Sequence, residues 1–191
     1  MISASNKSEA ANRSWTKAME DWDIRRTITA YADAAEKVKA AGLDGFEITA
    51  YGHLFDQFLS PLTNERTDEY GGSLENRMRF GFEVLEAVRE RVGPDYIVGL
   101  RMVCDEDIAG GISREEGLTI AHTFAASGLI DFMNVIRGHI ATAAGLSKVI
   151  PGMGARSAPH LDFAGEVRAK TRLTTMHAAR IQDVATARHA V

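Results

Sequence analysis

Short strand-like segments alternate with longer helix-like segments through most of this chain, and this alternation limits the fold more than any other feature. Between residues 24 and 38, apolar residues recur at steps of three and four, which is the spacing of one helix face. The expected strands span residues 45–48, 96–101, 131–136 and 173–178. Strands that alternate with helices in this way pair in parallel. We therefore expect an α/β fold built on a parallel sheet.

Helix-start signals mark several boundaries. Asp23 is the expected N-cap of the first helix, and a second helix is expected to begin at Ser73 and to end before Gly93. Ser113 and Glu116 form the S-x-x-E pattern of a capping box. Further helices are expected from residue 161 and from residue 183.

Charge and composition disfavour several classes of function. The net charge of −4 gives no electrostatic reason to expect nucleic acid or an anionic membrane as a partner. No apolar run approaches the roughly 20 residues that span a bilayer, and residues 1–15 lack the apolar centre of a signal peptide. The single Cys104 excludes an internal disulfide. We expect a cytoplasmic protein with no metal site and a small-molecule partner.

The stretch from Leu54 to Phe80 is the most distinctive segment, and it reads LFDQFLSPLTNERTDEYGGSLENRMRF. Its order closely resembles a segment of the old yellow enzyme family of FMN-dependent oxidoreductases. The resemblance covers residues 19–191. It is closest to the branch that contains trimethylamine dehydrogenase, 2,4-dienoyl-CoA reductase and N-methylproline demethylases, through GLDGFEITAYGHLFDQFLSP, YIVGLRMVCDED and HAARIQDVATARHAV. We expect the stretch itself to be scaffold, with no side chain in the chemistry.

The resemblance implies a TIM (β/α)8 barrel of which this chain covers about strands four to seven. A complete barrel takes about 250 residues, and four strands leave unpaired edges that natural proteins avoid. We therefore expect a partial barrel, an excerpt of a larger enzyme. Residues 1–191 would form a single partial FMN-binding domain, in which residues 1–20 are a polar loop segment and residues 21–191 carry the alternating units.

Two arginines are the expected FMN ligands. Arg101 ends an expected strand, and the resemblance implies a contact to the pyrimidine side of the flavin, where a guanidinium stabilises negative charge. Arg180 follows the last strand, at the usual phosphate site of such barrels. The alternatives are a surface ion pair for Arg101 and a partnership with Asp183 at a helix start for Arg180.

Tyr51, His53 and His139 are the expected catalytic residues. The family commonly has a His-x-x-His or His-x-x-Asn pair followed by a Tyr donor, whereas this chain reads ITAYGHLFDQF. This departure disfavours a standard ene-reductase site. His53 can exchange a proton near neutral pH, and His139 follows a strand in the Arg137-Gly138-His139 segment. The alternatives are a packed aromatic for Tyr51 and a rim histidine for His53.

Acidic residues near the expected strand ends have other interpretations. Glu47 lies within a strand, and a carboxylate that points into a barrel needs a partner. Asp105, Glu106 and Asp107 follow the next strand without a nearby His or a spaced loop pattern. We expect them to form a solvated rim or a contact to a substrate cation rather than a metal site.

The leading hypothesis is an FMN-dependent oxidoreductase that transfers hydride between flavin N5 and a small organic substrate, with oxidative N-demethylation favoured. The alternative reaction is reduction of an enoyl substrate, with NAD(P)H as the electron donor. The alternative from another class is a non-catalytic barrel fragment that needs another chain or the missing strands. An iron–sulfur centre is expected only if a cysteine-rich region follows, and a homo-oligomer is left open.

Overall fold

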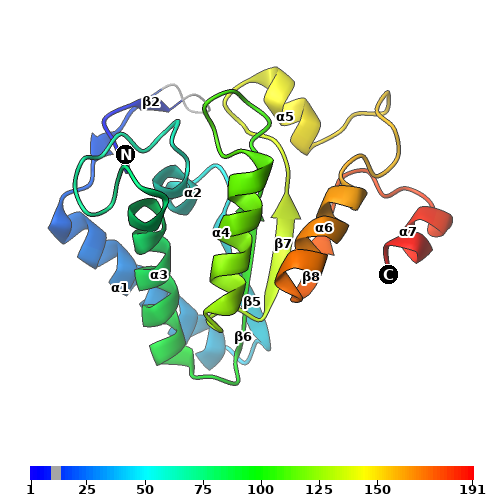
Figure 1. Cartoon of the computed structure of the whole chain (residues 1–191). Helices are drawn as coiled ribbons and strands as arrows, with labels where there is room; N and C mark the ends of the chain where they lie inside the picture. Colours follow the sequence, from blue (N-terminus) through cyan, green and yellow to red (C-terminus); the bar gives the residue numbers. More distant parts are fainter. Residues whose placement is uncertain (10–13) are drawn as a thin grey trace.

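A four-stranded parallel sheet forms the centre of the computed structural model, which describes residues 1–9 and 14–191 (Figure 1). The strands are paired in chain order, so each crossover moves to the adjacent position. They are β5 (Gly45–Ala50), β6 (Ile97–Val103), β7 (Phe132–Ile136) and β8 (Thr174–His177). The predicted parallel α/β fold is therefore confirmed. β6 continues two residues beyond the predicted end at Arg101, because Met102 and Val103 still pair with neighbouring strands.

Five helices lie where the sequence predicts them. They are α1 (Asp21–Ala40), α3 (Leu74–Val92), α4 (Arg114–Ala126), α6 (Leu161–Thr171) and α7 (Val184–Ala190). The Ser73 and Ser113 side chains accept hydrogen bonds from backbone N–H groups in the first turns of α3 and α4. Of the predicted capping box, the Ser113 half is present, whereas the Glu116 carboxylate forms an ion pair with Arg77. The prediction for Asp23 is wrong by three residues. The N-cap of α1 is Glu20, and Asp23 lies inside the first turn, where its carboxylate accepts from the Glu20 N–H at 3.2 Å.

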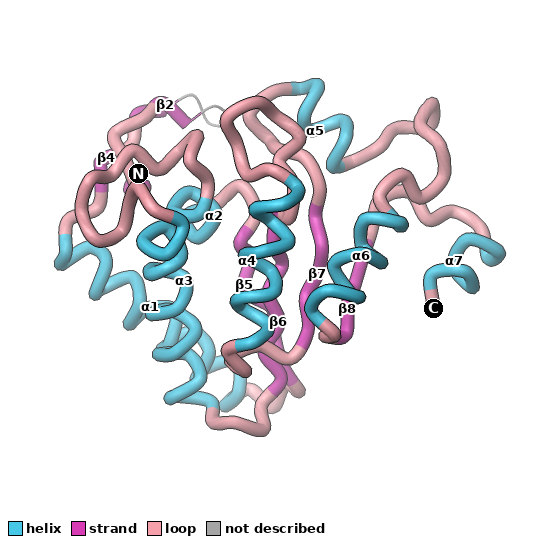
Figure 2. The backbone as a smooth tube through the Cα atoms, in the orientation of Figure 1, coloured by secondary structure: helices cyan, strands magenta, loops and turns pink. Residues whose placement is uncertain are grey.

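Two short helices are additional to the predicted elements. α2 (Leu54–Leu59) lies within the distinctive stretch, and α5 (Ala143–Val149) lies in the glycine-containing connection after β7. Each has fewer than two turns, which is too short for a readable helical periodicity. Both follow strands and lie at the same end of the sheet, where Figure 2 shows the connecting loops gathered.

The first 20 residues, expected as a polar loop, contain two small two-stranded sheets. β1 (Ile2–Ser3) pairs in parallel with β4 (Lys17–Ala18), and β2 (Ser8–Glu9) pairs in antiparallel with β3 (Ser14–Trp15). Arg66 holds this segment in place, because its Nη1 donates to the carbonyls of Ala4 and Met19 at 3.0 and 2.7 Å. The distinctive stretch thus fastens the N-terminal segment beside α2.

The two faces of the sheet differ in what covers them. Ile48, Leu100 and Met133 point to the face covered by helices and are buried in the apolar core; Figure 1 shows α4 and α6 in front of the sheet. On the opposite face, the Phe132 ring occupies the space above Gly99. A Cβ at Gly99 would lie 2.0 Å from Phe132 Cζ, so the ring requires glycine at that position.

Aromatic stacking fixes α2 against α3 within the distinctive stretch. Phe58 and Phe80 are fully buried and stack with ring centroids 4.3 Å apart. Asn64 closes the intervening loop by donating to the carbonyls of Phe58 and Tyr70, both at 2.7 Å.

None of the helices in the described part of the chain is both long enough and apolar enough to span a membrane.

Candidate active site at the carboxyl ends of the strands

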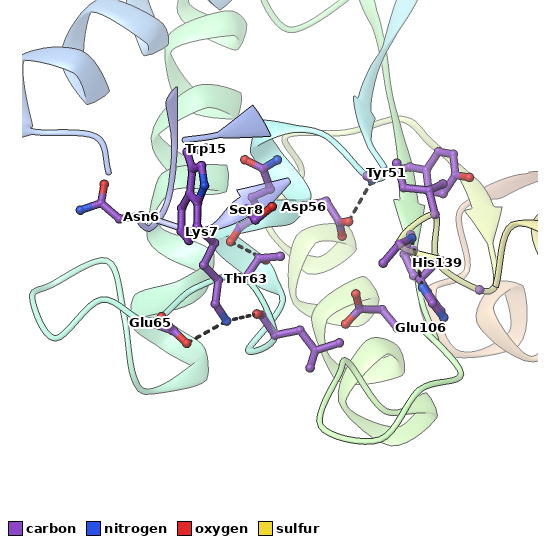
Figure 3. Close-up of a pocket in the computed structure, with 17 residues that line it drawn as sticks. Asn6, Lys7, Ser8, Trp15, Tyr51, Asp56, Thr63, Glu65, Glu106 and His139 are labelled. Atoms are coloured by element: carbon purple, nitrogen blue, oxygen red, sulfur yellow. Dashed lines mark hydrogen bonds and ion pairs between the residues drawn. The ribbon is translucent and has the colours of Figure 1, made fainter. Parts of the chain in front are cut away.

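The loops after β5, β6 and β7 meet the N-terminal segment around a cavity of about 560 Å³ (Figure 3). The carboxyl ends of parallel strands lie on one edge of a sheet, so residues far apart in sequence reach the same space. Part of the lining is apolar or aromatic and part is charged. The residues that matter most for its chemistry are Lys7, Trp15, Tyr51, Asp56, Glu106 and His139.

Two of the three expected catalytic residues line this cavity. Tyr51 directly follows β5, and burial together with the nearby Asp56 carboxylate raises the pKa of its phenol. His139 follows β7, and its Nδ1 accepts a hydrogen bond from the Ala141 N–H at 3.2 Å. That bond places the proton of a neutral ring on Nε2. Tyr51 and His139 therefore bring a phenol ring and an imidazole ring to the lining of one cavity.

His53 lies apart from these two residues. It is exposed, it precedes α2, and it does not line the cavity. Its backbone carbonyl accepts from the Gln57 N–H at 3.0 Å, which is a helix-start role. Gly52, with a φ of +63°, turns the chain between Tyr51 and His53.

Arg101 lies on the sheet face opposite the helices, and its guanidinium forms an ion pair with Glu47 on β5. The second oxygen of that carboxylate, Oε2, accepts from Asn134 Nδ2 on β7 at 2.9 Å. Three neighbouring strands thus contribute one polar row, and the partner that Glu47 was expected to need is present. The Arg101 side chain is 40% exposed, so N–H groups remain available to a cofactor on this face.

Arg180 lies in the loop after β8 in a left-handed backbone conformation, with a φ of +56°. Its Nη1 and Nη2 donate to the carbonyls of Gly152 and Met153 at 2.9 and 2.6 Å. Each terminal nitrogen keeps a second N–H, which is the donor set that a phosphate requires. The alternative partner, Asp183, instead caps α7 by accepting from the Thr186 N–H at 2.7 Å.

Two buried carboxylates lie in the cavity wall: Glu106, for which a contact to a substrate cation was one of the two expectations, and Asp56, which was not predicted. Asp56 is 8% exposed and Glu106 is 6% exposed. Burial, together with the negative charge of Glu106, raises the pKa of Asp56 to about 7. Asp56 belongs to the stretch that we expected to be scaffold alone. The only signal in the sequence was a charged residue among the apolar residues of LFDQFL.

The acidic cluster after β6 is buried rather than solvated at two of its three positions, since Asp105 and Glu106 are each 6% exposed. Asp105 pairs with Arg137 at 2.8 Å, and Asp107 pairs with Lys148 at 2.6 Å. Within the described residues, His, Cys, Asp and Glu side chains form no group of three or more that could hold a metal ion.

Known proteins resemble this chain along its length. The profile of the NADH:flavin oxidoreductase / NADH oxidase family matches residues 2–189. A probable N-methylproline demethylase from Rhizobium meliloti (strain 1021) is 57% identical over 191 residues. A multifunctional alkene reductase/demethylase OYE from Caballeronia cordobensis is 42% identical over 192 residues. Both alignments cover 100% of this chain and 28% of the relative.

A solved structure of 2-naphthoyl-CoA reductase in complex with 2-naphthoyl-CoA has the same arrangement of elements. It superposes with a TM-score of 0.90 at 31% sequence identity, and the match covers 99% of this chain and 28% of that chain. The chain therefore spans 28% of the length of each of these three proteins.

Proposed function

Because the chain belongs to the NADH:flavin oxidoreductase / NADH oxidase family, we propose that the protein oxidatively demethylates a small N-methylated amine with FMN as its cofactor. Members of this family bind FMN and use NAD(P)H. The observation that carries the proposed reaction is the 57% identity to a probable N-methylproline demethylase over the whole chain. We assign the four strands to positions four to seven of a (β/α)8 barrel.

The residues present fit an FMN cofactor at two points. Arg101 offers free N–H groups on the uncovered sheet face, and its Nε is buried without a hydrogen-bond partner among the described residues. Arg180 offers paired N–H groups in the loop after β8, where the phosphate group of FMN would lie. FMN, when bound, supplies the two-electron acceptor or donor. Arg101 would stabilise negative charge on the reduced ring, and Glu47 would keep its guanidinium in place.

The cavity residues would orient the substrate beside that cofactor. Tyr51, Val103 and Ile140 provide an apolar wall that excludes water from the reacting carbon. His139 presents an N–H from Nε2 that can donate to a carboxylate or a carbonyl of the substrate. The side chains thus hold the substrate at both an apolar and a polar end.

Alkene reduction is the second candidate. It is supported by Tyr51, which lines the cavity and whose phenol is a proton donor suited to the carbon that does not receive the hydride. The 42% identical relative is described as both an alkene reductase and a demethylase.

A non-catalytic fragment is the third candidate. In the described part of the chain, β5 and β8 each pair with one strand only.

Anaerobic flavin reduction separates these candidates. The FMN-loaded protein is mixed with N-methylproline, with proline as the unmethylated control, and the oxidised flavin absorbance is followed while formaldehyde is assayed. We expect N-methylproline to bleach the flavin and to release formaldehyde, and proline to do neither. Reduction by NADH alone, followed by reoxidation with an enone, would instead support alkene reduction. A protein that takes up no flavin would support the fragment.

A further inference from the structure

We propose that Asp56 and Glu106 form a subsite for the protonated nitrogen of a small amine, within the cavity that contains Tyr51 and His139. This inference deepens the proposed function and rests on it for the location of the substrate. The subsite would select secondary and tertiary amines, which carry an N–H when protonated, over neutral compounds of the same shape.

Asp56 has an acceptor atom that no described residue satisfies. Its Oδ2 accepts from the Gly52 N–H at 2.9 Å, whereas Oδ1 is buried without a hydrogen-bond partner. The neighbouring Gln57 Oε1, on the same wall, is also buried without a partner. Figure 3 shows the Asp56 carboxylate on the cavity wall, between Tyr51 and Glu106. Two unsatisfied acceptors on one wall call for a ligand that donates hydrogen bonds.

Glu106 is held rigidly beside this wall by its own contacts. Its Oε2 accepts from Ser60 Oγ and from the Ile112 N–H, both at 2.6 Å. Both donors are neutral, so they hold the side chain in place without pairing its charge. Glu106 therefore contributes a fixed negative charge close to Asp56.

Neither carboxylate forms an ion pair with a basic side chain in the part of the chain that the structure describes. Lys7 also lines the cavity, but its Nζ is bound by Glu65 at 2.7 Å and by the Leu62 carbonyl at 2.6 Å. Arg137, after β7, pairs with Asp105. Burying a carboxylate without a counter-charge is costly, and a cationic ligand would supply the positive charge that the protein side chains do not.

The rest of the cavity suits an N-methyl group. Trp15 and Tyr51 supply aromatic faces, which attract ammonium groups, and Leu62 and Val103 supply aliphatic contacts for methyl carbons. Transfer of the ammonium proton to the Asp56 carboxylate breaks the N–H bond and leaves the lone pair on nitrogen. The resulting neutral amine is the form whose adjacent C–H can be oxidised.

The test compares binding with turnover in the FMN-loaded protein. Asp56→Asn removes the ionisable group, which is charged above its pKa of about 7, without changing the shape of the side chain. Binding is therefore measured at pH 8, and Asp95→Asn is the matched control. Asp95 is exposed and lies before β6, at the opposite end of the sheet. The probes are N-methylproline and cyclopentanecarboxylate, which lacks the nitrogen. Isothermal titration calorimetry gives the two affinities, and flavin content with circular dichroism verifies folding.

We expect Asp56→Asn to weaken N-methylproline binding by roughly 10- to 100-fold, the range of a charge-assisted hydrogen bond, and to leave cyclopentanecarboxylate binding unchanged. Glu106→Gln is expected to weaken N-methylproline binding by a smaller factor and to leave cyclopentanecarboxylate binding unchanged. Asp95→Asn is expected to bind both probes as the wild type does. Wild-type affinity for N-methylproline in a folded Asp56→Asn protein would overturn the subsite.

The failure of the subsite and the failure of the proposed function give different results. If Asp56→Asn is reduced by N-methylproline as fast and at as low a concentration as the wild type, the subsite is wrong and the demethylase proposal stands. If the wild type binds N-methylproline selectively through Asp56 but its flavin is never reduced, the subsite stands and the demethylase proposal is wrong. If the wild type does not prefer the amine over cyclopentanecarboxylate, the subsite is wrong.

Discussion

Replacement of Asp56 by Asn is expected to invert the stability difference between variant and wild type as the pH rises. The pKa of Asp56 is raised from 3.8 to about 7, first by burial and then by the charge of Glu106, with the Gly52 N–H opposing. Between these two values the unfolded chain has released the proton and the folded chain retains it. The folded state therefore loses stability as pH increases from about 4 to about 7, by about 4 kcal/mol in total.

The Asn side chain does not titrate, but its buried NH₂ lacks an acceptor, at a cost of about 1 to 3 kcal/mol. We therefore expect Asp56→Asn to be less stable than the wild type by that amount near pH 4. It is expected to be more stable than the wild type by about 1 to 3 kcal/mol near pH 8. The two stability curves cross between these limits.

Urea unfolding at a series of pH values, followed by circular dichroism at one FMN concentration, measures this crossing. The Asp95→Asn variant, which removes an exposed carboxylate, is the control and is expected to follow the wild type. Glu106 and Tyr51 are the other titratable groups that face Asp56, so Glu106→Gln is expected to shift the crossing to higher pH. Parallel curves for Asp56→Asn and wild type from pH 4 to 8 would show that the pKa of Asp56 is not raised in the folded protein.

Three further predictions concern the fold. Gly99→Ala places a methyl group within the space of the Phe132 ring, and we expect the free energy of unfolding to fall by about 1 to 3 kcal/mol. Thermal unfolding measures this change, and an unchanged midpoint would contradict the packing. Ser113→Ala removes the N-cap of α4 and is expected to lower the free energy of unfolding, measured in urea, by about 1 kcal/mol. Ser113→Asp keeps a capping oxygen and is expected to unfold as the wild type does. Arg66→Met removes the hydrogen bond to the carbonyl of Ala4, so limited proteolysis is expected to cut within the first 20 residues sooner than in the wild type. Equal cleavage rates in the two proteins would show that Arg66 does not hold this segment.

Local signals account for what the sequence predicted correctly. Ser73 and Ser113 act within one turn of helix, and the strands are short apolar runs, so neither depends on distant residues. The rule that strand ends converge was enough to predict that Tyr51 and His139 belong together. Both line the same cavity.

Features that depend on register or on tertiary burial were not predicted. An ion pair for Arg101 and a partner for Glu47 were each considered, but that these two residues pair with each other depends on the register of β5 against β6. Asp56 looks like any polar helix residue until the loop after β6 brings Glu106 to the same cavity. His53 was grouped with Tyr51 by proximity in sequence, but the turn at Gly52 separates them.

We propose that these four strands carry a flavin site in which Arg101 is a ligand. Equilibrium titration of the flavin-free protein with FMN, followed by flavin fluorescence, tests this proposal. We predict one FMN per chain for the wild type, with Arg101→Gln binding roughly 10-fold or more weakly and Arg172→Gln, which alters an exposed arginine after α6, binding as the wild type. No FMN uptake by the wild type, or equal uptake by Arg101→Gln, would contradict the account.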